Sequence, residues 1–377
     1  MSQINRRQFV SGVSAAALAG IAGCSGDGGN GNGNGNGNGN GNGNGNGNGN
    51  GNGNGNGGGD TADQAVQYNA VNGWANYQTI RETFTEETGI EWPEDTKNSG
   101  QTLNALTNEK GNPQADAAYM GITDAIKAQS RDLTAPYEVE NFDEIPEDLK
   151  HEDGEWFANH YGTVGWAINN TLIDEPPETW EDLLDERFEN SISLYNPDSA
   201  FNGFINFVNA NLAMGGSLDN FDPGIQFFKD LQDRGNISSM PRQGVVTSFY
   251  QGEFPILLAY DFNAYNAKYQ SEMNSDDVSV VVPSDHSVQV PYTLNLVNNA
   301  PRPNAGKEIL DFQLSDTGQQ LFAEAFVTPI RDSVDLPSEI QEKRLPDSAY
   351  EASQPIDYVT LEENQEQARS RFVDEIL

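Results

Sequence analysis

A run of alternating glycine and asparagine, residues 29–56, is the feature that most restricts how this chain can fold. The run holds no apolar side chain to bury and has a large backbone entropy to lose on ordering, so it predicts random coil. Because a flexible chain spans about 5–6 Å × √n, such a segment would reach roughly 30 Å. We therefore expect residues 24–61 to form a disordered tether and the folded protein to begin near residue 62.

The residues before the tether resemble an export signal that ends at the only cysteine. Arg6 and Arg7 precede an uncharged stretch that is too short to span a bilayer, as in a secretory leader of the twin-arginine type. Ile21-Ala22-Gly23-Cys24 resembles a lipobox. We expect a signal over residues 1–23, a lipid on the Cys24 sulfur and a protein held on the outer face of the cell membrane. The alternative is that Cys24 is an ordinary small residue of a cleaved leader.

Acidic residues greatly outnumber basic residues in this chain. Asp and Glu number 57 against 20 Lys and Arg, a formal net charge of −37 spread along the chain. Nucleic acids need clustered basic residues, so a nucleic-acid partner is not expected. The self-repulsion is screened when the Debye length falls to about 3 Å near 1 M salt, which indicates an extreme halophile. A calcium-binding surface protein is a weaker alternative, because the sequence lacks a D-x-[DN]-x-[DN]-G loop.

Hydrophobic periodicity predicts that strands and helices alternate along the rest of the chain. Strands are expected at residues 65–70, 90–92, 115–120, 163–169, 191–195, 256–260, 278–282 and 288–297, and helices at 75–87, 100–110, 122–129, 180–184, 203–214, 224–232, 245–251, 304–314 and 317–326. This order is typical of α/β folds with parallel strands, whose ligands collect at the carboxyl ends of those strands.

The predicted fold class is α/β, with two lobes of mixed, mostly parallel sheets joined by crossing strands. Residues 62–164 with roughly 288–335 would form the first lobe, residues 165–287 the second lobe, and residues 336–377 a C-terminal helical segment.

Five stretches carry a family resemblance. They are "SGQTLNALTNEKGNPQADAAYMG" from Ser99, "YGTVGWAINNTLI" from Tyr161, "YNPDSAFNGF" from Tyr195, "YQGEFPILLAYDFNA" from Tyr250 and "LDFQLSDTGQQLFAEAFVTPIR" from Leu310. With the leader and tether, they resemble the extracellular solute-binding lipoproteins of ABC importers, in the branch that takes up thiamine, ferric iron, polyamines and sugar phosphates. The resemblance covers nearly all of residues 65–335.

This resemblance implies a type II periplasmic-binding-protein fold whose lobes close on a small solute and deliver it to a membrane permease. It also implies a monomer that binds without chemistry and without a cofactor. A ligand shifts such a hinge only by its differential affinity for the closed state.

In the first lobe, the candidate ligand-binding residues are Trp74, Ser99, Gly100, Gln101 and Tyr161. Ser99, Gly100 and Gln101 begin a predicted helix, whose free N–H groups suit an anion or polar group, although Ser99 would also serve as a plain helix cap. Trp74 follows the first strand and suits stacking on a planar ligand or a cation, or ordinary packing. Tyr161 lies on a presumed crossing strand, where half-buried packing is the alternative.

In the second lobe and on the other crossing strand, the candidates are Asn196, Ser199, Tyr260, Asp261, Phe262 and Tyr292. Asn196 and Ser199 stand at a strand-to-helix turn. Asp261, flanked by Tyr260 and Phe262, follows a buried strand and offers a carboxylate to a cation; the alternative is that it caps a helix or holds the hinge. Iron-binding relatives have adjacent tyrosines at the positions of Phe262 and Asn263, so the iron mode is weakened here.

The sequence thus favours a binding protein for thiamine, a polyamine or a related organic cation, with ferric iron or a sugar phosphate as alternatives. A secreted, tethered hydrolase is the alternative from another class. It lacks support because no G-x-S-x-G, P-loop or zinc motif is present, and no metal site is expected. His151, His160 and His286 are isolated and are expected at the surface or the hinge.

Overall fold

The computed structural model describes residues 62–377. The predicted signal over residues 1–23, the lipid attachment at Cys24 and the tether over 24–61 lie outside the described residues.

A mixed sheet runs through the described part of the chain in the order β1-β2-β9-β4-β7-β5-β6, with β3 and β11 paired to β9 and with β8 and β10 paired to β4. The strands are β1 Gln67–Tyr68, β2 Ala117–Gly121, β3 Thr134–Ala135, β4 Phe157–Asn169, β5 Ile192–Leu194, β6 Ile237–Ser239, β7 Ile256–Tyr260, β8 Val278–Val281, β9 Ser287–Val297, β10 Thr328–Pro329 and β11 Ser353–Gln354. β1 pairs parallel with β2, and β5 pairs parallel with β6 and β7. Every residue of β2 and β7 is buried, as expected of strands covered on both faces.

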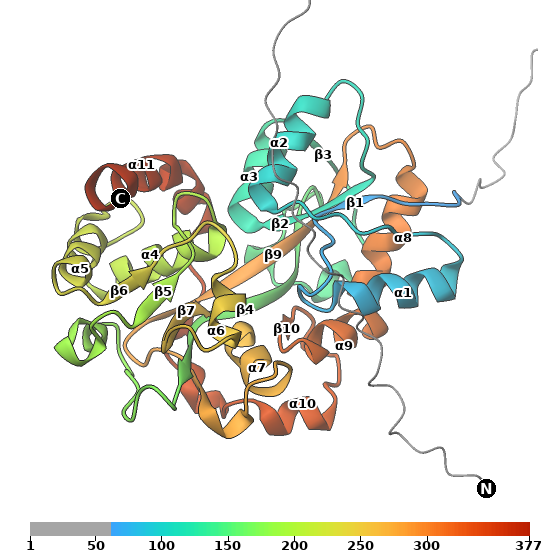
Figure 1. Cartoon of the computed structure of the whole chain (residues 1–377). Coiled ribbons are helices and arrows are strands. Elements are labelled where there is room, and N and C mark those ends of the chain that lie inside the picture. The colour runs from blue at the N-terminus through green and yellow to red at the C-terminus, as the bar shows by residue number, and fades with distance from the viewer. Residues whose placement is uncertain (1–61) are drawn as a thin grey trace, which may run out of the picture. The chain divides into compact units, whose positions relative to one another are not determined.

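Two long antiparallel strands join the lobes. β4 and β9 pair with each other from Phe157 to Thr163, including His160 opposite Tyr292. Beyond Thr163 β4 pairs with β7 and β8, whereas the other edge of β9, from Tyr292 to Val297, pairs with β2 and β3. The β1–β2 side is the first lobe and the β5–β7 side is the second lobe, and each lobe takes part of both long strands (Figure 1).

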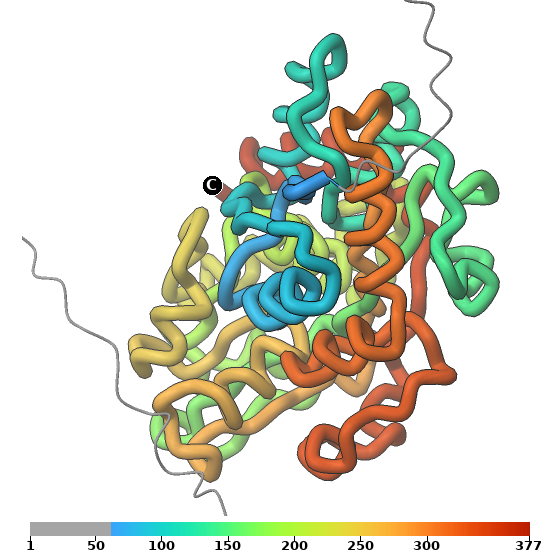
Figure 2. The backbone as a smooth tube through the Cα atoms, turned by 90° about the vertical axis from the view of Figure 1, so that its right-hand side faces the viewer, coloured from blue at the N-terminus to red at the C-terminus, as the bar shows by residue number. Residues whose placement is uncertain are grey.

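Helices cover the sheet on both sides. They are α1 Tyr77–Thr88, α2 Ser99–Glu109, α3 Ile122–Ser130, α4 Phe201–Ala213, α5 Asp222–Asp233, α6 Val245–Tyr250, α7 Asp261–Tyr269, α8 Pro303–Leu314, α9 Asp316–Glu324, α10 Ser338–Lys343 and α11 Tyr358–Ile376. In the first lobe α8 packs on β9 and β2, with α1 beside it (Figure 2), and α2 and α3 pack on β2. In the second lobe α4 packs on β7 and α7 on β4 and β8. One cluster of buried apolar side chains extends through both lobes.

The two-lobe α/β prediction is confirmed, with local differences. Residues 90–92 form only a single bridge, between Gln64 and Glu91, because the chain turns away after one residue of pairing. Residues 181–184 form a 3₁₀ turn instead of an α-helix. The segment 336–377 is helical only in part: it also contains β11, whose Ser353 pairs with Ser287.

Candidate ligand-binding site

A cavity of about 590 Å³ opens among both lobes and the C-terminal helix. Its lining residues are Asn69, Val71, Trp74, Thr96, Lys97, Asn98, Ser99, Gly100, Gln101, Leu103, Asp124 and Lys127 of the first lobe; Tyr195, Asp198, Ser199, Ala200, Phe201, Asn202, Arg242, Gln243 and Gly244 of the second; Tyr292 of β9; and Gln365, Glu366 and Arg369 of α11. Because the walls belong to both lobes, a ligand here contacts both.

The start of α2 forms one wall. Asn98 and Gln101 make a reciprocal capping box, in which the Asn98 side chain accepts from the Gln101 N–H and the Gln101 side chain accepts from the Asn98 N–H. The Ser99 hydroxyl accepts a hydrogen bond from the N–H of Gly121 at 3.0 Å, which ties α2 to the end of β2. Within residues 62–377, the N–H groups of Ser99 and Gly100 donate to no protein acceptor, so both remain available at the cavity.

The start of α4 forms the facing wall in the second lobe. Its N-cap, Ala200, has no side chain to cap the helix, and in the described chain the N–H groups of Phe201, Asn202 and Gly203 make no protein hydrogen bond. The Asn202 side chain is only 6% exposed, yet its Nδ2 has no partner among the described residues. A buried amide donor without an acceptor costs free energy, so this wall is suited to a ligand that supplies acceptor oxygens.

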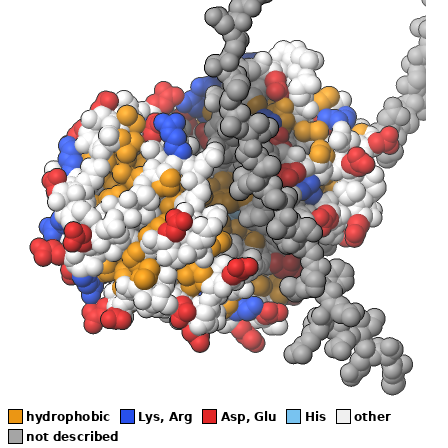
Figure 3. Space-filling model, in the orientation of Figure 1, with side chains coloured by type: hydrophobic (Ala, Val, Ile, Leu, Met, Phe, Trp, Pro, Cys, Tyr) orange, Lys and Arg blue, Asp and Glu red, His pale blue; other side chains and the backbone are white. Residues whose placement is uncertain are grey.

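Four cationic side chains line the cavity, in a chain whose net charge is −37. Lys97 pairs with Asp95 at 2.6 Å, and Lys127 pairs with Glu366. Arg242 is 76% exposed and lies 3.9 Å from Asp198. Acidic side chains are spread over the molecular face shown in Figure 3. The concentration of cations at the cavity therefore contrasts with the rest of the composition.

Arg369 is the most enclosed of these cations. Its Nη1 donates to the backbone carbonyls of Pro197 and Asp198, and its guanidinium lies over the Phe204 ring, 4.0 Å from the centroid. Burial lowers the pKa of Arg369 to about 10, so it remains protonated at neutral pH. Burial also raises the pKa of Asp124, against the lowering effect of Arg369 and Lys127.

Aromatic rings form the floor. Trp74 and Tyr292 line the cavity with ring centroids 5.7 Å apart. The Trp74 indole donates to the Tyr119 hydroxyl at 3.0 Å, and that hydroxyl lies 2.8 Å from Nε2 of His160. His160 is fully buried on β4, and burial lowers its pKa to about 3, so it is neutral. Of the two expected placements for His160, the structure therefore shows the hinge and not the surface.

The structure brings six of the sequence candidates to the cavity: Trp74, Ser99, Gly100, Gln101, Ser199 and Tyr292. Asn196 lies just behind the wall, where its side chain accepts from the Asp198 N–H at 2.9 Å and shapes the turn before α4. Tyr161 lies on β4 opposite Thr328 and Pro291, away from the lining.

Asp261, Tyr260 and Phe262 are placed differently from the expectation. Asp261 is 1% exposed and accepts from the N–H groups of Thr163 and Phe262 and from the Tyr350 hydroxyl, at 2.9, 2.8 and 3.1 Å. Its carboxylate therefore binds the first turn of α7 and ties that helix to β4, and it does not line the cavity. Tyr260 is fully buried, and Phe262 packs edge-on against Trp74 at 5.3 Å, beneath the floor.

The sequence reasoning missed Asp124, Asn202, Arg242 and Arg369. Asn202 lies inside the quoted "YNPDSAFNGF" stretch, three residues after Ser199, so the helix start was a usable signal. Arg369 follows Pro197 by 172 positions and reaches the cavity only because α11 docks there. No local sequence pattern around Arg369 predicts its contact with Pro197.

Hinged lobes with a polar cavity between them define a solute-binding protein, and sequence comparison agrees. Residues 124–352 match the family model described as bacterial extracellular solute-binding protein. The chain belongs to this family, whose members are the solute-binding proteins of ABC importers.

Curated relatives and solved structures extend the comparison. The chain is 26% identical over 270 residues, 70% of its length and 76% of the relative's, to a Salmonella typhimurium protein named "Putative 2-aminoethylphosphonate-binding periplasmic protein". It resembles the periplasmic binding protein AfuA of Actinobacillus pleuropneumoniae with fructose-6-phosphate bound (TM-score 0.68, 20% identity, 84% of this chain and 98% of that one). Iron-bound HitA of Pseudomonas aeruginosa is similar (TM-score 0.68, 19% identity, 83% and 99%). At these identities, the structural matches establish the fold.

Residues 62–377 lack two features. None of the helices there is both long and apolar enough to cross a membrane. In the same residues, His, Cys, Asp and Glu side chains form no group of three or more around a common point.

Proposed function

We propose that this protein captures a small solute that carries a phosphonate or phosphate group together with an amino group, and passes it unchanged to an ABC permease. The observation that supports this most is the first turn of α4. There, the free N–H groups of Phe201 and Asn202 belong to residues that line the cavity, and Nδ2 of Asn202 has no partner in the described chain. An anion at a helix N-terminus accepts from such donors and is favoured by the helix dipole.

A tetrahedral phosphorus oxyanion matches the donors of the site. It offers three acceptor oxygens, which suit N–H groups from α2 and α4 and the guanidinium group of Arg369, whereas Arg242 is 76% exposed and adds a screened attraction. The organic cation favoured by the sequence depended on Asp261. Since that carboxylate is occupied by hydrogen bonds outside the cavity, it does not bind a cationic solute there.

The relatives support the same chemistry. The Salmonella relative is named for 2-aminoethylphosphonate, and AfuA is described with fructose-6-phosphate bound. Both solutes carry a tetrahedral phosphorus oxyanion. A hexose phosphate is the second candidate, because a cavity of about 590 Å³ admits a ligand larger than an aminoalkylphosphonate.

A binding screen in molar salt tests the proposal. Melting of the protein is measured with 2-aminoethylphosphonate, fructose-6-phosphate, thiamine, spermidine and ferric citrate. A solute at 100 times its Kd stabilises the folded state by about 2.7 kcal/mol. We expect the phosphonate or the sugar phosphate to raise the melting temperature. Stabilisation by thiamine, spermidine or iron alone would contradict the proposal. Phosphorus NMR of the incubated solute checks that it is unchanged, which separates binding from hydrolysis.

A substitution at Asn202 tests whether the ligand oxyanion binds at the start of α4. Asn202→Asp keeps the side-chain shape but sets a carboxylate beside the ligand oxyanion, and we expect at least about tenfold weaker binding from the loss of about 1.4 kcal/mol or more. Asn274→Asp is the matched control, because Asn274 is exposed, caps a 3₁₀ turn and lies outside the cavity lining. If Asn202→Asp and Asn274→Asp bound the solute with equal affinity, the start of α4 would not be part of the binding site.

We further propose that the protein works as a monomer held by a lipid on Cys24 outside the cell, after twin-arginine export, and at molar salt. The lipobox-like residues and the acidic composition support this. Mass spectrometry of the N-terminal peptide tests the lipid, and Cys24→Ala should release the protein into the medium. Unfolding at low salt tests the salt requirement.

A further inference from the structure

The C-terminal helix α11 belongs to no motif on which the function rests, and it lies beyond the residues 124–352 that match the family model. We propose that α11 forms a wall of the site that contacts the ligand. Arg369 on α11 binds the oxyanion of a zwitterionic solute, and Asp124 on α3 binds its ammonium group. This assignment rests on the proposed function and specifies its substrate class.

Contacts with both lobes fix the position of α11 (Figure 1). Toward the first lobe, Lys127 of α3 pairs with Glu366 and lies 3.9 Å from Glu362. Toward the second lobe, Phe372 packs against the rings of Phe207 and Phe228, with centroids 5.0 and 5.2 Å away.

Polar contacts strengthen the second-lobe side. Arg371 pairs with Asp222 at 2.8 Å, and Lys229 pairs with Glu375 at 2.7 Å, both joining α11 to α5. Because α11 is anchored on both sides, three of its residues are held at the cavity: Gln365, Glu366 and Arg369. Gln365 and Arg369 are four residues apart and therefore lie on one face of the helix.

Arg369 is positioned as an anion-binding residue. The carbonyls of Pro197 and Asp198 hold its Nη1, and Phe204 supports the guanidinium plane. Within residues 62–377, its Nε and Nη2 make no hydrogen bond and no carboxylate lies within 4.0 Å of the guanidinium. Asp124 and Asp198 act on this guanidinium only from beyond contact distance. A largely desolvated cation with no carboxylate in direct contact is costly, and a ligand oxyanion in the cavity would provide that contact. The Pro197–Asp198 turn leads directly into α4, so the oxyanion would also reach the free N–H groups of that helix.

Asp124 has the opposite charge and a similar situation. It lines the cavity from the first turn of α3, and in the described chain its carboxylate makes no hydrogen bond and no ion pair within 4.0 Å. An acidic residue in the first turn is already favoured by the helix dipole, so its presence alone does not require a ligand. A carboxylate and a guanidinium that line one cavity and attract each other without direct contact leave room between them for the two opposite charges of a zwitterion. Two charges on separate elements also select for the distance between the charged groups of the solute.

The test uses calorimetric titration of the full chain with 2-aminoethylphosphonate and with ethylphosphonate, which lacks the ammonium group. Arg369→Gln should weaken both solutes by about 10- to 100-fold, as for the loss of a charge-assisted hydrogen bond. Asp124→Asn should weaken only 2-aminoethylphosphonate by a similar factor and leave ethylphosphonate within about twofold. Arg369→Lys keeps the charge but loses the planar fork, and should fall between wild type and Arg369→Gln.

Arg187→Gln is the control, since Arg187 pairs with the exposed Glu175 and Asp185 outside the cavity lining and does not contact α11; it should bind both solutes as wild type does. Wild-type affinity in Arg369→Gln, or equal losses for both solutes in Asp124→Asn, would overturn the assignment while leaving the proposed function intact. If the wild type binds no phosphonate or phosphate ester, the proposed function fails and this assignment fails with it. Should Arg369→Gln melt far below wild type, Arg369→Lys and Asp124→Asn decide the matter.

Discussion

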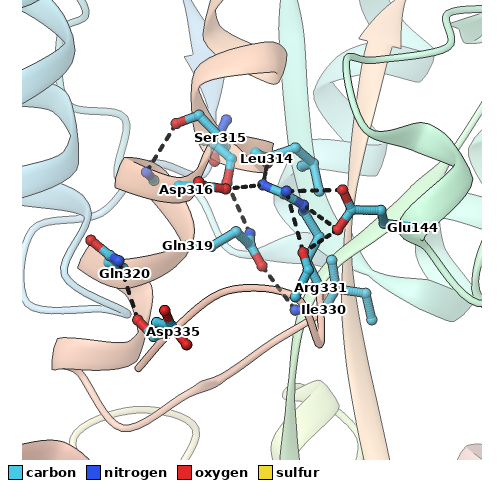
Figure 4. Close-up of polar contacts among 12 residues, drawn as sticks. Glu144, Leu314, Ser315, Asp316, Gln319, Gln320, Ile330, Arg331 and Asp335 are labelled. Atoms are coloured by element: carbon cyan, nitrogen blue, oxygen red, sulfur yellow. Dashed lines mark hydrogen bonds and ion pairs between the residues drawn. The ribbon is translucent and has the colours of Figure 1, made fainter. Parts of the chain in front are cut away.

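Arg331 connects three distant segments of the first lobe and offers a sharp test of how its fold is held (Figure 4). Its Nε and Nη2 bind the two carboxylate oxygens of Glu144, each at 3.0 Å. Its Nη1 donates to the carbonyl of Leu314 and to the carboxylate of Asp316, both at 2.8 Å. The substitution Arg331→Met keeps most of the buried stem and removes all of these donors.

The magnitude follows from the exposure of each partner. The Asp316 side chain is 75% exposed, so its ion pair is screened and contributes about 0–1 kcal/mol. The Leu314 carbonyl is buried, and leaving it without a donor costs about 1–3 kcal/mol. Glu144 is exposed, and we assign its pair only a stabilising direction. The free energy of unfolding should thus fall by about 1–4 kcal/mol, which at about 2.1 cal/mol/K of unfolding entropy per residue corresponds to roughly 2–6 °C in melting temperature.

Calorimetric melting at fixed molar salt measures the effect. Arg371→Met is the control, because Arg371 pairs with Asp222, 74% exposed, and Glu375, 31% exposed, and should cost no more than about 1 kcal/mol. The hydrogen bonds from Arg331 lower the pKa of Glu144, so their contribution is present above the ordinary carboxyl pKa and is lost as pH falls through the lowered one. Equal melting temperatures for wild type and Arg331→Met, or equal losses in both variants, would refute this reasoning.

Two further predictions concern the hinge and the α4 wall. Burial lowers the pKa of His160 from 6.5 to about 3, so between these pH values the unfolded chain binds one more proton than the folded protein, and the free energy of unfolding falls as pH decreases. Denaturant unfolding at pH 7.5 and pH 5 should therefore show a smaller loss of stability in His160→Gln than in wild type. An equal loss in the two proteins would contradict this assignment. In Gly203→Ala, the new Cβ would press on the Tyr195 carbonyl and lie 2.9 Å from the Asn196 carbonyl carbon, so we expect a loss of about 1–3 kcal/mol of stability and weaker solute binding. Gly111→Ala, where nothing lies within 4 Å of a new Cβ, should change neither the melting temperature nor the titration.

Much of the fold was predictable because local signals and tertiary packing agree. Helix 304–314 was expected where α8 spans Pro303–Leu314, and Gly89 ends α1 in the left-handed conformation that favours glycine. The strand expected at 90–92 failed because a short apolar run specifies burial but not a pairing partner, and the structure buries Trp92 against Phe84 instead.

The site was predictable only where a helix start marks it. Ser99, Gly100, Gln101 and Ser199 precede or begin helices at the strand ends, where ligands of α/β folds collect, and the structure places them at the cavity. The same logic could not show whether Asp261 faces the cavity or binds backbone N–H groups, since both arrangements put a carboxylate after a buried strand.

The acidic composition bears on which cation selects the solute. At molar salt the Debye length is about 3 Å, so an exposed charge such as Arg242, 76% exposed, should attract a ligand little, whereas the enclosed Arg369 is screened much less. We expect Arg242→Gln to weaken phosphonate binding at about 0.1 M salt, where the Debye length is about 10 Å, and to have almost no effect near 1 M. Arg369→Gln should weaken binding by a similar factor at both salt concentrations. Titrations of the two variants at both concentrations check this, with melting curves to confirm that each protein is folded at low salt. If Arg242→Gln weakened binding equally at both salt concentrations, Arg242 would be enclosed when the solute is bound. The charge that selects the solute would then be Arg242 of the second lobe and not Arg369 of α11.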